Sequence, residues 1–231
     1  MTVQHSSAYV SNGVAIPQQA GPARRLAVVR EDGRAAVRDG ERAVVRDLRG
    51  RTGPDRLLFG PGDLVVVSGL PGSGKTTLIQ RAVRAPRLDS QDSRDRWAGF
   101  MPRFLPYAVY RPLVRIAHYA RLRRTLRSGA EAVVHDCGTQ AWVRRWLSRE
   151  ARRRGTSLHL LLLDVEPSTA LAGQRDRGRG VSRYAFTRHR GAVGRLVRDA
   201  EKGELPPGCA SVVLLDRESA GGLDVVGFRT A

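Results

Sequence analysis

One short stretch constrains the fold of this chain more than any other part of the sequence. It follows the pattern G-x-x-x-x-G-K-T, in which a glycine-rich loop precedes a lysine and a threonine. Its residues are Gly69, Leu70, Pro71, Gly72, Ser73, Gly74, Lys75, Thr76 and Thr77. A β-branched apolar run over residues 64–67 comes before it, and a helical pattern over 76–83 comes after it. Strand, glycine-rich turn and helix form the setting in which this pattern binds phosphate.

The chemistry of this stretch follows from its residue types. Glycines allow consecutive backbone N–H groups to approach a polyphosphate, and the N-terminus of the following helix adds partial positive charge. We expect the Lys75 ammonium to reach the β- and γ-phosphates of a nucleotide and the Thr76 hydroxyl to bind Mg²⁺. Residues 69–77 are therefore predicted to be a nucleotide-binding loop with Mg²⁺ as the accompanying cation.

Short apolar segments alternate with helical patterns along the chain. They cover residues 64–67, 87–89, 130–136, 158–163 and 211–216. The alternation predicts an α/β fold of the P-loop NTPase class, a doubly wound, five-stranded parallel sheet with helices on both faces. Ligands bind at the carboxyl ends of the strands in such sheets. Asp89, Asp136 and Asp164 are expected at those ends, on the same edge as the phosphate-binding loop.

The chain also divides into regions of different character. Residues 1–23 lack periodicity, which predicts a disordered tail. Residues 24–60 contain short apolar runs separated by Asp-Gly pairs, which predict a small β-rich extension folded as a meander. The P-loop domain is expected over 61–216, and residues 217–231 have the character of a C-terminal tail.

The segment between the second and third predicted strands is rich in proline, arginine and aromatic residues. Pro102, Pro106 and Pro112 exclude one long helix over 98–112, so a helix is predicted only from Leu113 to Leu126. The arginines of residues 103–127 are interleaved with Phe and Tyr side chains. This mixture suits either a nucleic-acid groove or a subdomain that binds a second substrate.

The net charge favours anionic partners. The chain has 231 residues and a formal net charge of +18, and its 40 basic residues include only two lysines, Lys75 and Lys202. Such a charge suits nucleotides, phosphorylated metabolites, RNA or DNA. No apolar run is long enough to span a membrane and no signal peptide is recognisable, so a cytoplasmic location is expected.

Three stretches together resemble the P-loop kinases, and among them the zeta-toxin, polynucleotide-kinase and gluconate-kinase-like group. The first is the loop 69–77. The second, Leu88–Arg94, is similar to the Asp-then-Arg motif that follows the second strand in that group. The third runs from Leu162 to His189 and resembles the fourth strand, helix and arginine-bearing lid. In the broad P-loop NTPase sense, the chain is similar to AAA-type ATP-binding proteins.

The resemblance implies roles for several residues. It implies ATP as the nucleotide, Asp89 as general base toward an acceptor hydroxyl, and Arg94 as a residue that helps to hold the acceptor. Asp92 also precedes Arg94, at another spacing, and is the alternative base and a further candidate for acceptor binding. Arg175 and Arg179 lie one helical turn apart and would close over the phosphates as part of an Arg-rich lid.

The resemblance also bears on the Mg²⁺ site. In this kinase topology the third strand neighbours the first, so Asp136 at its end is the carboxylate expected to bind Mg²⁺ through water, together with Thr76. Asp164 also follows an apolar strand and is the alternative.

These features predict an ATP-binding P-loop protein, and first an Mg²⁺-dependent kinase that transfers the γ-phosphate of ATP to a hydroxyl of a small molecule or nucleotide. One alternative is a polynucleotide kinase that acts on a 5′-hydroxyl of RNA or DNA, which the charge of +18 favours. The other is a nucleotide-dependent accessory ATPase or switch that acts on a protein partner, which the N-terminal extension favours.

Overall fold

The computed structural model of the protein describes residues 44–51, 53–85, 87–88, 99–100, 107–135, 140–176 and 181–230. The strands are β1 (Val44–Asp47), β2 (Arg56–Phe59), β3 (Leu64–Gly69), β4 (Arg87–Leu88), β5 (Ala132–His135), β6 (Leu158–Leu163), β7 (Ser211–Leu215) and β8 (Val225–Phe228). The helices are α1 (Lys75–Ala82), α3 (Tyr107–Arg127), α4 (Ala141–Arg153), α5 (Pro167–Arg175), α6 (Arg183–Glu201) and α7 (Arg217–Gly222).

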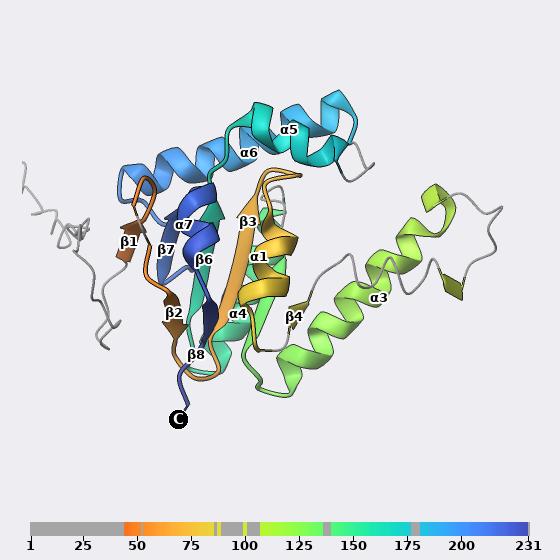
Figure 1. Ribbon diagram of the computed structural model, residues 1–231. Coiled ribbons are helices and arrows are strands. Elements are labelled where there is room, and N and C mark those ends of the chain that lie inside the picture. Colours follow the sequence, from red (N-terminus) through yellow and green to blue (C-terminus); the bar gives the residue numbers. More distant parts are fainter. Residues whose placement is uncertain are drawn as a thin grey trace, which may run out of the picture.

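Six of these strands form one parallel sheet, with the order β1-β7-β6-β3-β5-β4 (Figure 1). The strand before the phosphate-binding loop, β3, therefore lies between β5 and β6. Gly69 at the end of β3 pairs with Leu163 at the end of β6, so their carboxyl ends meet at one edge. The predicted doubly wound parallel α/β sheet is confirmed, with one strand more than the sequence indicated.

The additional strand comes from the N-terminal extension. In β1, Val44 lies opposite Ser211 and Asp47 opposite Leu214, so this strand covers the edge of β7 in parallel orientation. Val44 and Val45 belong to the last of the three apolar runs expected to form a meander, and they pair with a distant strand. The other two runs lie outside the described residues, so the meander itself stays a prediction. The predicted tail 1–23 and the first part of the extension, residues 24–43, lie outside the described residues.

The C-terminal residues are structured as well. After β7, residues expected to form a tail make α7 and then β8, which pairs in parallel with β2 as a separate two-stranded sheet. A capping box explains the start of α7, because Asp216 accepts from the Ser219 N–H and Ser219 accepts from the Asp216 N–H. Short polar stretches with such local caps resemble loops in sequence, which is why this element was not predicted.

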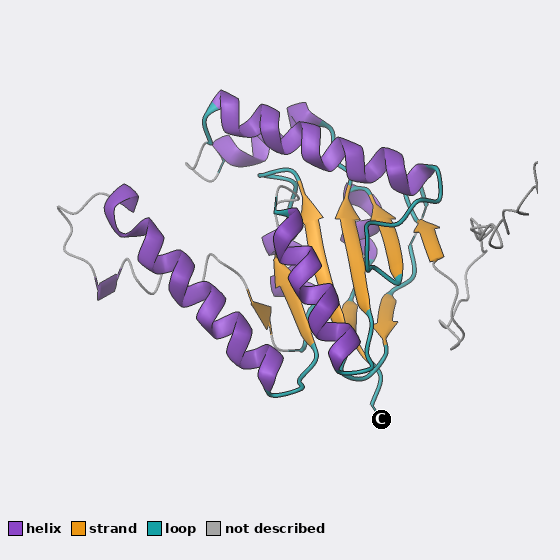
Figure 2. Ribbon diagram, turned by 180° about the vertical axis from the view of Figure 1, so that it is seen from behind, coloured by secondary structure: helices purple, strands orange, loops and turns teal. Residues whose placement is uncertain are grey.

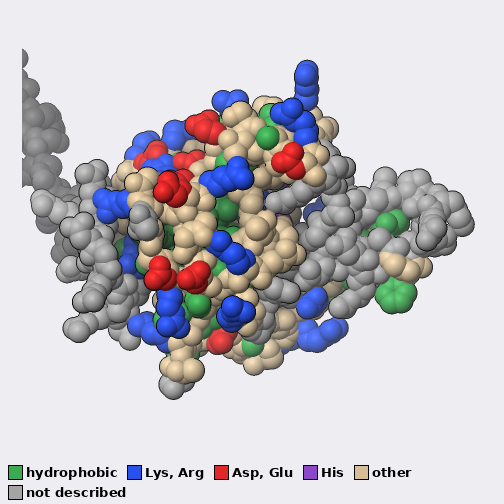
Figure 3. Space-filling model, viewed as in Figure 1, with side chains coloured by type: hydrophobic (Ala, Val, Ile, Leu, Met, Phe, Trp, Pro, Cys, Tyr) green, Lys and Arg blue, Asp and Glu red, His purple; other side chains and the backbone are tan. Residues whose placement is uncertain are grey.

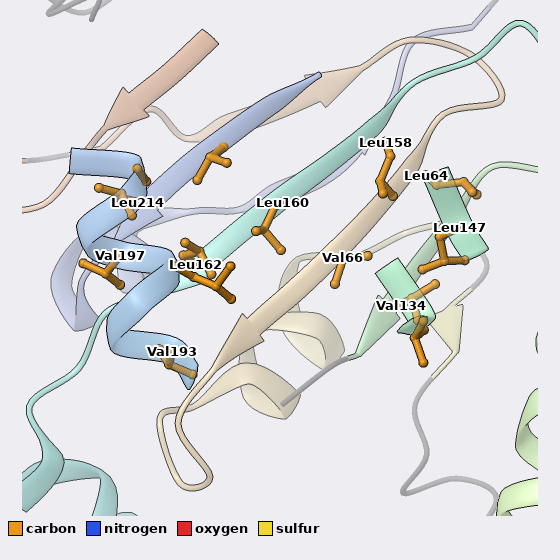
Figure 4. Packing of buried hydrophobic residues seen from close by; sticks show 14 of the residues in the cluster. Leu64, Val66, Val134, Leu147, Leu158, Leu160, Leu162, Val193, Val197 and Leu214 are labelled. Atoms are coloured by element: carbon orange, nitrogen blue, oxygen red, sulfur yellow. The ribbon is translucent and has the colours of Figure 1, made fainter. Parts of the chain in front are cut away.

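The sheet is buried on both faces because its central strands β3, β5, β6 and β7 are apolar at nearly every position. One face carries Leu64, Val66 and their neighbours, packed against residues of α3, α4 and α6 (Figure 4). The other face carries Val65 and Val67, packed against α1, α7 and the β2–β8 sheet. Figure 2 shows these layers from behind. Helices on both faces, as predicted, leave the carboxyl edge of the strands as the accessible place for a ligand.

Helix α3 begins at Tyr107, earlier than predicted, and contains Pro112. The proline removes one backbone hydrogen bond, which a stripe of buried side chains on both sides of it offsets. This stripe follows the i, i+4 spacing of one helix face and consists of Tyr110, Val114, His118, Leu122 and Leu126. The first half of α3 extends away from the sheet (Figures 1 and 2). Among the described segments, none of the helices is sufficiently long and apolar to span a membrane.

Candidate functional site

The phosphate-binding loop leaves β3 at Gly69 and enters α1 at Lys75. Gly72 and Gly74 have backbone φ angles of 87° and 96°, a region that favours glycine. A Cβ atom added at Gly72 would lie only 2.0 Å from the carbonyl oxygen of Ala170 in α5. Gly72 is thus required both by its backbone conformation and by the close approach of α5.

The side chain of Lys75 lies beside the backbone of the loop, and the residue is only 4% exposed. Its ammonium donates to the carbonyl oxygens of Gly69 and Leu70 at 3.0 and 2.7 Å. These bonds keep the charge next to the loop, where a phosphate would compete with the two carbonyls for its protons. The ammonium therefore lies beside the loop backbone, and its contact with a phosphate stays a prediction.

The start of α1 has the features of an anion site. Gly74 is its N-cap residue, and no side chain in the described part of the chain caps this end of the helix. The Ser73 hydroxyl is buried and has no hydrogen-bond partner among the described residues. A buried hydroxyl without a partner costs about 1–3 kcal/mol. A bound polyphosphate would satisfy both this hydroxyl and the first N–H groups of α1.

Helix α5 lies across the loop, at the end of β3 from which the loop emerges (Figure 1). Its first residue is Pro167, which favours a helix start because its missing N–H would have no partner there. Ala170 and Gln174 of this helix are buried. Arg175 ends the helix with an exposed side chain, next to the residue that contacts the loop. One of the two predicted lid arginines is thus carried by the helix that covers the loop.

The structure describes only part of the predicted site. Thr76, the expected Mg²⁺ ligand, lies half-buried in the first turn of α1, and Thr77 beside it is exposed. Several other predicted site residues lie outside the described residues; they are Asp89, Asp92, Arg94, Asp136 and Arg179. The predicted base, acceptor-binding residues and Mg²⁺ carboxylate therefore remain predictions.

The side chains at the loop fit an Mg²⁺ ion that is bound with a nucleotide. Mg²⁺ takes oxygen ligands and usually binds through phosphates together with one or two protein side chains. The Thr76 hydroxyl at the start of α1 is an oxygen ligand of this kind. Within the described segments, there is no group of three or more His, Cys, Asp or Glu side chains that would hold a metal ion.

Asp164, the alternative Mg²⁺ ligand, is engaged in an ion pair. Its carboxylate accepts from the Arg49 guanidinium at 2.6 Å. The same guanidinium pairs with Asp47 at 2.7 Å and with Glu201 at 2.9 Å. Burial opposes the charge on Asp47, but its hydrogen bonds with Arg49 outweigh burial and lower the pKa of this carboxyl. The Asp164 carboxylate thus neutralises a guanidinium, and a metal ion would have to displace that pair.

Sequence reasoning did not identify Arg49. The signal present in the sequence was an Asp-x-Arg pattern, Asp47-Leu48-Arg49, one residue after the apolar pair Val44-Val45. That pattern places an acid and a base at the carboxyl end of a strand, which is the edge where the site lies. In an arginine-rich chain, nothing in the sequence separates this arginine from solvated ones.

An aromatic cluster joins α3 to the first turn of α4. The Tyr119 ring lies 5.0 Å from the Trp142 ring and 6.5 Å from the Trp146 ring, between centroids. The Tyr119 hydroxyl donates to the side-chain oxygen of Gln140, the N-cap residue of α4. Trp146 is partly buried against the core, whereas Trp142 is 46% exposed. Within this cluster, Gln140 and Trp142 follow residues 136–139 closely in sequence, at the N-terminus of α4.

Solved structures show related chain traces. A protein from Chloroflexus aurantiacus, provisionally named a kinase, is 16% identical with a TM-score of 0.45, covering 70% of this chain and 88% of that chain. A structure of the PezAT toxin-antitoxin system of Streptococcus pneumoniae is 13% identical with a TM-score of 0.49, covering 74% of this chain and 72% of that chain. Shikimate kinase from Acinetobacter baumannii is 13% identical with a TM-score of 0.41, covering 70% of this chain and 87% of that chain. No curated protein sequence matches this chain significantly.

A family comparison covers the central part of the protein. The family described as AAA domain matches residues 64–200, which is more than half of the chain. The matched region begins with β3 and contains the phosphate-binding loop, α1, β5, β6, α5 and nearly all of α6. It therefore includes the loop, the two strands that flank β3 and the helix that covers the loop. The chain belongs to the AAA domain family.

Proposed function

We propose that the protein is an ATP-dependent, Mg²⁺-requiring kinase that transfers the γ-phosphate to a hydroxyl of a small molecule or nucleotide. The observation that carries this proposal is the close packing of α5 on the phosphate-binding loop, where a Cβ at Gly72 would lie 2.0 Å from Ala170 O. That helix leads directly into the arginine-rich segment 175–179. Phosphoryl transfer depends on positioning and charge neutralisation around the transferred group, and cations above the loop serve this purpose.

On the donor side, backbone N–H groups of the loop and the start of α1 would hold the β- and γ-phosphates. The Lys75 ammonium would neutralise charge on the oxygens that it contacts, and the Thr76 hydroxyl would ligate Mg²⁺. We assign the remaining Mg²⁺ contact, through water, to Asp136. When bound, Mg²⁺ neutralises charge on the phosphate oxygens.

On the acceptor side, Asp89 would accept the proton of the attacking hydroxyl, with Asp92 as the alternative base and Arg94 holding the acceptor. A bond forms between the acceptor oxygen and the γ-phosphorus, and the bond from that phosphorus to the β–γ bridging oxygen breaks. ADP leaves with the electron pair of the broken bond. Arg175 and Arg179 would stabilise the negative charge on the transferred group.

Within the P-loop kinases, we propose the zeta-toxin, polynucleotide-kinase and gluconate-kinase-like group. Support comes from the Leu88–Arg94 motif and from the strand, helix and arginine pattern over Leu162–His189. We favour a small-molecule or nucleotide acceptor over a nucleic acid. On the face shown in Figure 3, the described Lys and Arg side chains are interspersed with Asp and Glu and do not form one basic surface.

The test is transfer of labelled γ-phosphate from ATP, with a small-metabolite pool and a 5′-hydroxyl RNA offered separately. Lys75→Ala and Asp89→Asn are compared with the wild type. Lys202→Ala is the matched control, because the only other lysine lies exposed at the end of α6. We expect label in the metabolite pool, a loss on the order of a hundredfold or more in Lys75→Ala, and wild-type transfer in Lys202→Ala.

The outcomes separate the candidate functions. Label on the metabolite that is lost in Asp89→Asn supports a small-molecule kinase with Asp89 as base. Label on RNA overturns the proposed acceptor class. Label only in free phosphate, at a rate unchanged by Asp89→Asn, overturns the kinase proposal and points to an ATPase or switch.

A further inference from the structure

We propose that Gln174 is a positioning residue that couples occupancy of the phosphate-binding loop to the start of α6. It would act across the segment that carries the predicted lid arginines. The inference rests on the proposed function in one respect, that the loop binds the phosphates of ATP. It adds a role for Gln174 and two hydrogen bonds, which the motifs of the sequence do not supply.

The first part of the argument is the contact between α5 and the loop. A Cβ atom built at Gly173 would lie 2.7 Å from the carbonyl oxygen of Gly72, and one built at Gly72 would lie 2.9 Å from Cγ of Gln174. Residues 170, 173 and 174 share one helix face by their i, i+3 and i+4 spacing. This face is in van der Waals contact with the loop, so a shift of the loop backbone displaces atoms of α5.

The second part is the hydrogen bonding of the Gln174 amide. Its nitrogen donates to the carbonyl oxygen of Pro71 in the loop at 3.1 Å. Its oxygen accepts from the backbone N–H of Val181 at 3.0 Å. The residue is 6% exposed, so both bonds are formed largely out of water. One side-chain amide therefore joins the phosphate-binding loop to the residue that precedes the N-cap of α6.

The third part is what lies between these two points. Gln174 and Val181 are 7 residues apart in sequence, and the stretch between them contains Arg175, Arg177 and Arg179. The hydrogen bond from the Val181 N–H to Gln174 links the described residues on either side of this stretch. Both are linked through the Gln174 amide to the Pro71 carbonyl.

Only a residue with both a donor and an acceptor can make this connection. Glutamate would accept from Val181 but would bring negative charge against the Pro71 carbonyl. Methionine fills a similar volume and makes neither bond. Because coupling between two sites is reciprocal, ATP bound at the loop should stabilise the Val181 bond, and loss of that bond should weaken ATP binding.

The experiment compares the wild type with Gln174→Met and Gly173→Ala. Gly173→Ala pushes α5 from the loop, since its Cβ would lie 2.7 Å from Gly72 O. Gly191→Ala in α6 is the matched control, because the nearest atom to its Cβ is the end of the Arg195 side chain at 3.7 Å. Hydrogen exchange of the Val181 amide, ATP and inorganic triphosphate affinities with Mg²⁺, and the melting temperature are measured for each.

We expect faster exchange of the Val181 amide in Gln174→Met, and on the order of tenfold weaker binding of ATP and triphosphate. ATP should slow this exchange in the wild type and in Gly191→Ala, but not in Gln174→Met. Gly173→Ala should weaken binding in the same direction. This pattern separates positioning from a purely structural role, which would lower the melting temperature and leave affinities and ATP-dependent protection unchanged.

Two results would overturn the proposal, and they are distinguishable. If the wild type and Gln174→Met bind ATP equally and ATP protects the Val181 amide in both, the coupling role of Gln174 is wrong while nucleotide binding stands. If the wild type binds neither ATP nor triphosphate, the coupling and the proposed function fail together.

Discussion

The guanidinium of Arg49 lies 2.6 Å from the carboxylate of Asp164, although 115 residues separate them in sequence. The same group holds Asp47 and Glu201, so it links the ends of β1, β6 and α6. The guanidinium neutralises the charge of three carboxylates, and without it these like charges would repel one another. Hydrogen bonding to Asp47, more than any other contact, raises the pKa of Arg49 above its ordinary value.

The first prediction concerns this cluster. Arg49→Met should lower the free energy of unfolding at pH 7 by about 1–2 kcal/mol, a modest value because the side chains involved are partly exposed and screened. Urea denaturation measures the effect. Arg115→Met, at an exposed position of α3, is the matched control and should change stability by less than about 0.5 kcal/mol.

The same variant should show a distinct pH dependence. In the wild type, the lowered pKa of Asp47 stabilises the fold above the ordinary carboxyl range, and this contribution is lost as pH falls through the folded-state pKa. In Arg49→Met the carboxylates lose their partner, so its deficit relative to the wild type should shrink as pH falls below about 4. A deficit that stays constant from pH 7 down to pH 4 and below would contradict this account.

The second prediction concerns a buried cluster at the amino ends of the strands. His159 contacts Ser211 Oγ at 2.7 Å and Asp63 Oδ2 at 3.0 Å. The Asp63 carboxylate also accepts from the N–H groups of Ser157 and Gly60. Burial by itself raises the pKa of Asp63, but these hydrogen bonds, that of His159 first, outweigh it and leave the pKa below its ordinary value.

Asp63→Asn should therefore destabilise the protein by about 1–3 kcal/mol at pH 7, because a buried set of donors loses its carboxylate. Since the folded-state pKa of Asp63 is lowered, its contribution is present above about pH 4 and is lost as pH falls through the folded-state value. Denaturation at a series of pH values should show the two proteins converging in acid. The exposed Asp224→Asn serves as the control, and convergence at high pH instead would refute the assignment.

The third prediction separates two reasons for glycine in the phosphate-binding loop, namely the close packing of α5 and the positive backbone φ angle. Gly72→Ala should weaken ATP binding more than tenfold, since the added Cβ would lie 2.0 Å from Ala170 O at a φ of 87°. Gly74→Ala meets no atom within 4 Å and carries only the conformational cost, about 1–2 kcal/mol. Calorimetric titration with ATP and Mg²⁺ measures both, and equal losses would show that α5 yields at no cost.

Elements of this fold were predictable from the sequence where the residues that specify them lie close together in the chain. The β3–loop–α1 unit was predictable, because its glycines, lysine and flanking apolar runs all lie within one short stretch. The position of β5 beside β3 followed from the resemblance to P-loop kinases. In contrast, β1 and β8 are short apolar runs whose partners lie at the opposite end of the chain. Nothing in four residues specifies a distant strand.

The candidate site shows the same division. The placement of Lys75 and Thr76 at the start of α1 was predictable from spacing, whereas the contacts of Arg49 and Gln174 were not. Their importance comes from contacts with Asp164 and with Pro71 and Val181, which only the folded chain brings together. The start of α3 was misjudged for a related reason, because tertiary packing of the buried stripe through Leu126 outweighs the local penalty of Pro112.

The pairing of β1 with β7 and of β2 with β8 has a consequence for synthesis on the ribosome. Among the described residues, each of these N-terminal strands pairs only with a strand near the C-terminus. Strands β1 and β2 must therefore wait, unpaired, until β7 and β8 have been made. The central unit of β3, β5 and β6 can assemble earlier, since its strands pair with one another. The β1–β7 edge of the large sheet and the separate β2–β8 sheet are thus completed last, and both use strands outside the region that the AAA domain family matches.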